Sequence, residues 1–220
     1  MRKALCTVPL LLLLLLLASC ALLKPIESSK PESTAPPVGP GSLTALRTLL
    51  AEASPSAVSC TVTYDDPAIG LPLAAETRLS FDGSVGTLSY RYDRLNPIGS
   101  DGFTSTVSGE ASGDLATLSA ALSGSAAWVW DATVGISLPS IRLEHAYLAT
   151  AEITASGTEY LLRATPTAGN TGALLGLALA DATDVVLQIR FTDDAVSLVQ
   201  LCYGLGSATY TVTASFTYSD

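Results

Sequence analysis

His145 limits the possible chemistry most, because it is the only histidine in the 220-residue chain. A metal site built on several histidines is therefore excluded, and a Ser-His-Asp triad would have to use this one side chain. Residues 141–147, which surround it, contain no nucleophile-elbow pattern. We expect His145 to lie at the edge of a secondary-structure element. The sequence predicts no catalytic residues, no metal ion and no cofactor, so we do not expect an enzyme.

Three acidic groups lie where turns are expected. They are Asp65-Asp66, Asp181 with Asp184, and Asp193-Asp194. Carboxylates bind calcium, but none of these groups has the spacing of an EF-hand loop. A glycosidase would need two carboxylates across a cleft, and the sequence identifies no such pair. Because aspartate favours turns through its own hydrogen bonds, we interpret all three groups as turn residues.

Two further motifs invite a functional interpretation. Trp128 and Trp130 would lie on one side of a strand, where a tryptophan pair can form the floor of a sugar or lipid site. Packing in the core is the simpler interpretation of this pair. Gly204-Leu205-Gly206 lacks the third glycine of a dinucleotide-binding loop and lies between expected hairpin strands, so it predicts a turn.

The chain begins with the pattern of an export signal. Arg2 and Lys3 precede an apolar run at residues 4–17, which is too short to span a bilayer as a stable helix. The run ends in Leu17-Ala18-Ser19-Cys20, which resembles the lipobox of bacterial lipoproteins. The resemblance implies that residues 1–19 are removed and that Cys20, the first mature residue, carries acyl chains. We therefore expect an exported protein, anchored by lipid at the cell surface or at the periplasmic face of a bacterial membrane.

The mature chain would be strongly acidic. Removal of Arg2 and Lys3 reduces the 11 basic residues to 9 against 20 acidic ones, a net charge of −11. Nucleic acid is an improbable partner for such a chain, because binding to phosphates requires lysine and arginine. The expected partners are the bilayer, through acylated Cys20, and a hydrophobic ligand or an envelope protein.

The other cysteines have different expected fates. Cys6 would be removed with the signal. Cys60 and Cys202 remain as an even pair inside expected strands, and export favours oxidation, so we predict a disulfide between them. The alternative is two separate buried thiols that act as small apolar residues.

The mature chain divides into a tether and a single domain. Residues 20–42 hold Cys20 and a stretch rich in proline and serine, which predicts a tether with no fold of its own. Residues 43–220 are long enough for one domain with a substantial core. Ser42 is expected to cap an amphipathic helix over residues 43–53. A second, apolar helix is expected over residues 171–180, lying against a sheet.

Most of the domain alternates between apolar and polar residues with period two, which predicts strands. Asp82-Gly83 indicates a hairpin, and the last three strands form an antiparallel meander with one buried face. Residues 103–110 predict a weaker strand, and residues 114–122 suit either a helix or a strand. The expected strands cover residues 58–64, 73–81, 88–92, 185–191, 196–203 and 208–218.

The order of lipobox, tether, amphipathic helix and long antiparallel strands resembles the LolA/LolB/LppX-like lipoprotein fold. This resemblance implies an α+β fold: a mainly antiparallel sheet, curved into a half-barrel, with one to three short helices on its concave face. It also implies a space between sheet and helices that holds acyl chains. We therefore expect a lipoprotein that binds a hydrophobic ligand there. The alternative is an envelope interaction module with a filled core, and a hydrolase or metalloenzyme is the weakest hypothesis.

Overall fold

We describe the protein from a computed structural model. The structure describes residues 39–82, 85–96, 102–122, 129, 138–175 and 181–219. The export signal, Cys20 and the tether up to residue 38 lie outside these residues, as do Trp128 and Trp130. No helix in the described part of the chain is long and apolar enough to cross a membrane.

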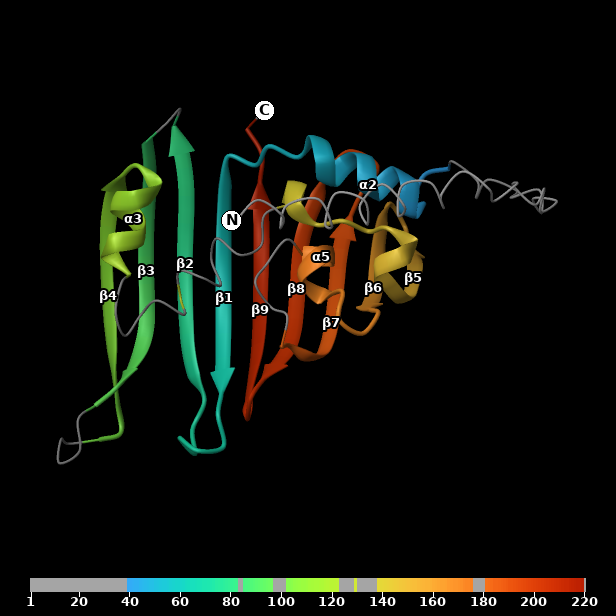
Figure 1. Ribbon diagram of the computed structural model, residues 1–220. Helices are drawn as coiled ribbons and strands as arrows, with labels where there is room; N and C mark the ends of the chain where they lie inside the picture. Colours follow the sequence, from blue (N-terminus) through green and yellow to red (C-terminus); the bar gives the residue numbers. More distant parts are fainter. Residues whose placement is uncertain are drawn as a thin grey trace, which may run out of the picture. The chain divides into compact units, whose positions relative to one another are not determined.

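Among the described residues, nine strands form one antiparallel sheet, in the order β4-β3-β2-β1-β9-β8-β7-β6-β5 (Figure 1). The sheet consists of two meanders, β1–β4 and β5–β9, which are joined where the first strand pairs with the last. The two edge strands are therefore β4 and β5. The strands are β1 Ala57–Asp65, β2 Leu73–Asp82, β3 Val85–Leu95, β4 Thr104–Gly113, β5 Leu148–Ser156, β6 Glu159–Pro166, β7 Thr183–Phe191, β8 Val196–Leu205 and β9 Ala208–Thr217.

The two faces of the sheet differ because side chains alternate along every strand. One register row runs across the core-facing side through Thr77, Cys60, Ala214, Val199 and Ile189, from β2 to β7. All five of these residues are buried. The opposite face carries mostly serine, threonine and charged residues, which are largely exposed.

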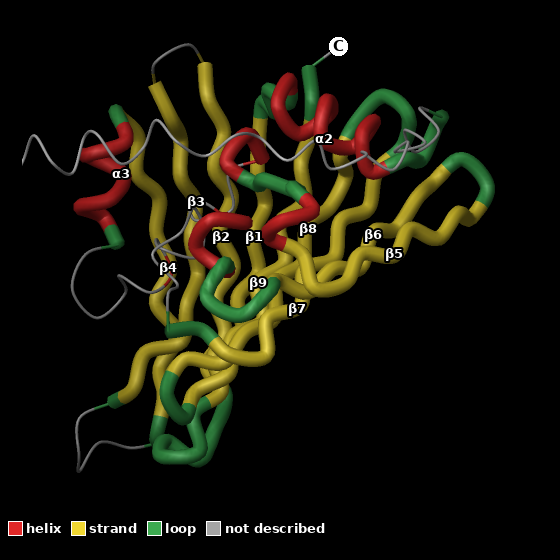
Figure 2. The backbone as a smooth tube through the Cα atoms, turned by 45° about the vertical axis from the view of Figure 1, so that its right-hand side comes forward, coloured by secondary structure: helices red, strands yellow, loops and turns green. Residues whose placement is uncertain are grey.

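The sheet curves, and its apolar side is the concave one, where the helices lie (Figure 2). Helix α2, Leu43–Glu52, begins at Ser42, whose hydroxyl accepts a hydrogen bond from the Ala45 amide at 3.1 Å. This N-cap satisfies one of the amides that a helix start leaves without a partner. Helix α2 buries Leu46 and Leu50 completely, and the short helix α5, Thr171–Leu175, buries Leu174 and Leu175.

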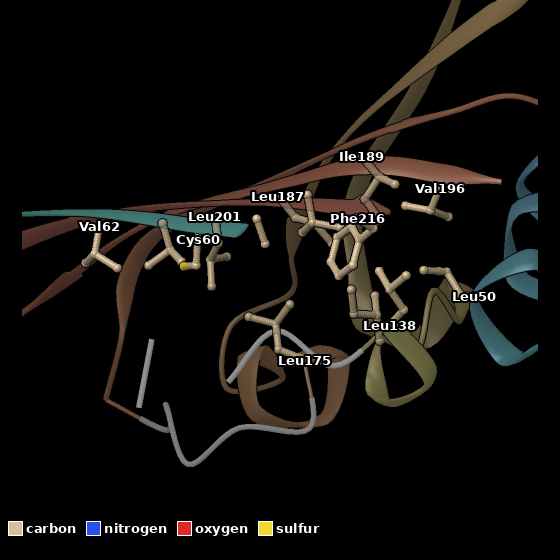
Figure 3. Packing of buried hydrophobic residues seen from close by; sticks show 14 of the residues in the cluster. Leu50, Cys60, Val62, Leu138, Leu175, Leu187, Ile189, Val196, Leu201 and Phe216 are labelled. Carbon is tan, nitrogen blue, oxygen red and sulfur yellow. The ribbon is translucent and has the colours of Figure 1, made fainter. Parts of the chain in front are cut away.

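The main core lies between these helices and strands β1 and β6–β9. In Figure 3, Leu50, Leu138 and Leu175 lie opposite Leu201, Val196 and the other labelled residues of the sheet. Leu138 belongs to a 3-10 turn, η3, at Leu138–Ser140. A second turn, η4, covers His145–Tyr147. These elements cover the concave face over the middle of the sheet, where the core-facing central residues of β7 and β8 are fully buried.

Helix α3, Leu115–Ala121, lies on the same face at the β4 edge of the sheet, against the upper part of β3 and β4 in Figure 1. Asp114 caps it by accepting a hydrogen bond from the Thr117 amide at 2.9 Å. Leu118 is fully buried, and one of its methyl groups lies 2.7 Å from where a Cβ atom of Gly86 would be. A glycine at this position of β3 therefore lets the helix approach the sheet closely.

The structure confirms the predicted fold class: an antiparallel sheet, curved and not closed, with short helices on its concave face. A strand lies over each of the expected ranges, except that Phe103 and Tyr218 lie just outside β4 and β9, and residues 115–121, whose pattern suited two structures, form helix α3. Of the second expected helix, Thr171–Leu175 is helical and residues 176–180 lie outside the described residues. The hairpin of β5 and β6 was not predicted. The alternation of apolar and polar residues is weak in β5 because this strand is almost entirely exposed.

Candidate ligand site

A row of aromatic side chains marks one end of the concave face, the lower end in Figure 1, where β1, β3 and β8 finish. Tyr64 of β1 pairs with Leu73 of β2 on one side and with Tyr210 of β9 on the other. Tyr203 of β8 lies opposite Tyr210. The Tyr203 and Tyr210 rings stack with centroids 4.9 Å apart, and the Tyr64 ring lies 5.0 Å from Tyr210.

A cavity of about 310 Å³ opens beside this row. Tyr64, Leu73 and Tyr210 belong to its lining and stand in core-facing register positions, so the cavity lies at the end of the concave face. Its volume is at the lower end of the range typical of small-molecule sites. The lining residues are Tyr64, Ile69, Leu73, Asp93, Arg94, Leu95 and Tyr210.

The rim at this end carries exposed apolar side chains. Leu95, at the end of β3, is 43% exposed, and Leu205, at the end of β8, is 39% exposed. Phe103, which precedes β4, is 82% exposed, and its carbonyl accepts a hydrogen bond from the Asn96 amide. Of these three side chains only Leu95 belongs to the lining of the cavity, since four strands separate β4 from β8 in the sheet.

Asp66 holds the loops at this end together. Its carboxylate accepts hydrogen bonds from the Tyr64 hydroxyl at 3.0 Å, the Ala68 amide at 3.0 Å and the Ser207 hydroxyl at 3.1 Å. Donation from the Ala68 amide and from Tyr64 lowers the pKa of Asp66. Burial, and then the hydrogen bond to Asp66, raise the pKa of Tyr64. Asp66 therefore links the β1–β2 loop to the β8–β9 turn and fixes one wall of the cavity.

Two other depressions are less suited to a ligand. One, of about 370 Å³, lies over β1–β3, and most of its lining residues, including Ser59 and Thr61, stand in outward-facing positions of the polar face. The second, of about 290 Å³, lies by edge strand β5 and includes His145, which is exposed. Within the described residues, no group of histidine, cysteine and carboxylate side chains has the geometry of a metal site.

The other acidic groups occupy turns and strand ends. Asp193 and Asp194 form the turn between β7 and β8, as predicted. Asp184 has a positive φ of 52°, and the β7–β8 register shifts between Thr183 and Val186, so this aspartate lies in an irregularity of the strand. The predicted turn at Gly204-Leu205-Gly206 includes the end of β8, and Gly206 adopts the left-handed conformation with φ of 63°.

The predicted disulfide between Cys60 and Cys202 is wrong: the two sulfurs form no disulfide in the structure. Cys60 belongs to the core-facing row of β1, whereas Cys202 lies opposite Thr211 on the outer face of β8. Strand β9 separates β1 from β8, so the two thiols lie on opposite sides of the sheet and two strands apart. This arrangement is incompatible with disulfide geometry. Sequence alternation shows which residues of one strand share a face, but not how the faces of two strands correspond.

Sequence analysis identified none of the seven lining residues as a binding residue, and Arg94 is the charged one among them at a core-facing position. Leu88, Tyr90 and Tyr92 were predicted to share one face, and continued alternation along β3 would have placed Arg94 on that face as well. Six of the lining residues come from β1, β2, β3 and the loop between β1 and β2, which are close in sequence. Only Tyr210 is distant, and its place beside Tyr64 depends on the pairing of β1 with β9, which the sequence pattern does not specify.

We expect the two thiols to differ in reactivity with iodoacetamide at pH 8. Burial raises the pKa of the Cys60 thiol to about 12 and excludes the reagent, whereas Cys202 is only half-buried. Peptide mapping by mass spectrometry should find Cys202 alkylated in the folded protein and Cys60 alkylated only after unfolding. Recovery of a Cys60–Cys202 disulfide peptide from the folded protein would contradict the arrangement described above.

Asp66→Asn should destabilise the protein in a pH-dependent way. Because the folded-state pKa of Asp66 is lowered, its contribution to stability is present above the unfolded pKa of about 3.9 and is lost as the pH falls through the folded pKa. The difference in unfolding free energy between wild type and variant, measured with urea, should be largest near pH 7 and shrink below pH 4. Asp65→Asn is the matched control and should show a smaller pH dependence. An Asp66→Asn difference that stays constant from pH 7 to pH 3 would rule out this role.

No protein-family model matches the chain, and no curated protein is similar to it in sequence. The function must therefore be inferred from the chain's own residues.

Proposed function

We propose that the protein is an exported lipoprotein, held at a bacterial membrane by acylated Cys20, that binds a hydrophobic, lipid-like ligand. The observation that carries the ligand-binding part is the cavity of about 310 Å³ at the lower end of the concave face. The anchoring part rests on the lipobox-like sequence that ends at Cys20. No catalytic role is included in the proposal.

The cavity lies at the end of the concave face and not under the helices, and this location determines where a ligand would bind. Over the middle of the sheet, α2 and α5 fill the concave face with buried leucines, so these helices plug the interior. The lower end differs, because Leu73 and the tyrosine row border open space there. A ligand would enter past Leu95 and lie against Tyr64 and Tyr210, whose rings offer a large apolar area together with a polar hydroxyl.

The filled middle of the core favours a second candidate, an envelope interaction module without a ligand. In that case the exposed apolar rim, with Phe103 as its most exposed member, would contact a protein partner. The two candidates predict different contents for the purified protein.

The anchoring proposal predicts that Cys20→Ser abolishes acylation. The full chain would be expressed in a bacterial host fed an alkyne analogue of palmitate, and the label would be measured on the isolated protein together with its distribution between membrane and soluble fractions. Wild type should carry the label and sediment with membranes, whereas Cys20→Ser should do neither. Cys6→Ser, within the expected leader, is the matched control and should behave as wild type. An unlabelled wild type would contradict the proposal.

The ligand-binding proposal predicts that the protein copurifies with a non-covalent amphiphile. The full chain with Cys20→Ser, purified without detergent, would be extracted with organic solvent and the extract analysed by mass spectrometry. After extraction, the protein should bind a fluorescent fatty acid. Leu95→Gln should weaken that binding about fivefold, through loss of roughly 1 kcal/mol of apolar contact.

Leu115→Gln is the matched control. Leu115 is 54% exposed on α3, far from the lining residues, so its substitution should leave the affinity unchanged. An empty extract, together with no binding of the fatty acid, would reject the ligand-binding proposal and favour the interaction module. Equal weakening by both substitutions would show that the fatty acid binds elsewhere.

A further inference from the structure

The cavity is short in the direction of the strands. Tyr64 and Tyr210 line it, and two residues further along the same strands Val62 and Val212 pair with each other, each only 2% exposed. The register row that contains these two valines is buried across five strands, at Tyr92, Ala75, Val62, Val212 and Leu201. Because two residues of a strand span about 6.6 Å, the open space ends roughly that far from the tyrosine row. A long hydrocarbon chain therefore has no room to continue from the cavity along the concave face.

The volume of the cavity suits a compact molecule. It is about 310 Å³. An apolar protein cavity of roughly 150 Å³ holds one benzene ring, so a space of about twice that size has room for about two fused rings.

The lining combines aromatic and aliphatic side chains. Tyr64 and Tyr210 contribute two rings, whose centroids lie 5.0 Å apart and whose planes form an angle of 47°. Ile69, Leu73 and Leu95 contribute aliphatic groups. Aromatic rings attract one another by offset stacking or edge-to-face contact, beyond the effect of the area that they bury. A flat ring system gains from the tyrosines what a flexible chain does not.

The two charged residues of the lining do not select a charged ligand. Asp93 and Arg94 have opposite signs, and Arg94 is exposed. The Asp93 carboxylate already accepts hydrogen bonds from the Ala74 amide at 3.1 Å and from the Thr106 hydroxyl at 3.3 Å. An uncharged ligand therefore fits this lining better than an ion of either sign.

The hydroxyls of the two lining tyrosines differ. The Tyr64 hydroxyl donates a hydrogen bond to Asp66 at 3.0 Å. No hydrogen bond of the Tyr210 hydroxyl occurs within the described part of the chain, although this side chain is half-buried. Tyrosine hydroxyls removed from water usually find a partner, so the Tyr210 hydroxyl is available to a polar substituent of a ligand.

Tyrosines at the end of a sheet can also serve only to cover the core, and Tyr203 shows this case. Its ring stacks on Tyr210 with centroids 4.9 Å apart, and it is not among the lining residues of the cavity. Tyr64 differs from Tyr203 because it borders open space.

We infer that the cavity binds a compact, uncharged ligand of about two fused rings, with a polar substituent that hydrogen-bonds the Tyr210 hydroxyl. The ring system packs on Tyr64 and against Leu73 and Leu95. A long-chain molecule fills the cavity with one end only, so it binds more weakly. This inference rests on the proposed ligand-binding function and narrows its ligand to a ring compound.

The test compares three ligands that have ten carbon atoms each. 2-Naphthol, naphthalene and 1-decanol would be titrated calorimetrically into the full chain with Cys20→Ser, which is the background for every variant. 2-Naphthol should bind about tenfold more tightly than 1-decanol, because its rings stack on tyrosine and a rigid molecule loses no chain freedom on binding. Naphthalene lacks the hydroxyl and should bind about fivefold more weakly than 2-naphthol.

Three variants separate these effects. Tyr64→Leu should remove most of the preference for 2-naphthol over 1-decanol. Tyr64→Phe keeps the ring but not the hydrogen bond to Asp66, so it should retain that preference. Tyr210→Phe should bind 2-naphthol no more tightly than naphthalene.

Tyr147→Leu is the matched control. It removes a tyrosine ring just before edge strand β5, whereas the lining residues come from β1, β2, β3, β9 and the β1–β2 loop, so all three affinities should stay unchanged. Equal binding of 1-decanol and 2-naphthol by wild type, or equal loss of the preference in Tyr64→Leu and Tyr64→Phe, would overturn the inference. In both cases the proposed function would stand, because a hydrophobic ligand still binds. If none of the three ligands binds, the inference also fails, and the fatty-acid experiment above shows whether the ligand-binding function fails with it.

Discussion

The fold depends on the pairing of β1 with β9. This ladder extends over nine residue pairs and brings together segments about 150 residues apart in sequence, including Val62 beside Val212 and Cys60 beside Ala214. Without it, the two meanders would be separate four- and five-stranded sheets, each with an exposed apolar face. Closing such a long loop costs chain entropy that local hairpins do not. The buried side chains along both strands must offset that cost, and folding through such distant contacts is expected to be slow.

The same pairing creates the candidate site. Tyr64 comes from β1 and Tyr210 from β9, and their rings lie 5.0 Å apart only because the two strands are neighbours. Asp66 then joins the loops that follow β1 and β8. The site is therefore a product of the sheet's central ladder, whereas the helices mainly cover the middle of the concave face.

Much of the fold could be predicted from the sequence, and the reasons are local. Period-two alternation identified the faces of β1–β3 and β7–β9, and the capping hydroxyl of Ser42 identified the start of α2. The hairpin of β5 and β6 was not predicted, because β5 is largely exposed on both faces and its sequence shows little alternation between apolar and polar residues. The site was harder to predict. The wrong Cys60–Cys202 disulfide depends on how the faces of different strands align, which alternation within one strand does not show.

The two edge strands also affect how copies of the protein behave when crowded. On their outer sides, strands β4 and β5 pair with no other strand of the described residues, and unpaired backbone groups at such an edge allow sheets to join edge to edge. Glu152 stands at the centre of β5, so a symmetric antiparallel pairing of two β5 strands would place two carboxylates face to face. Strand β4 carries Glu110 among serines and glycines, residues that form strands poorly. Both edges of the sheet therefore carry residues that disfavour pairing with another copy.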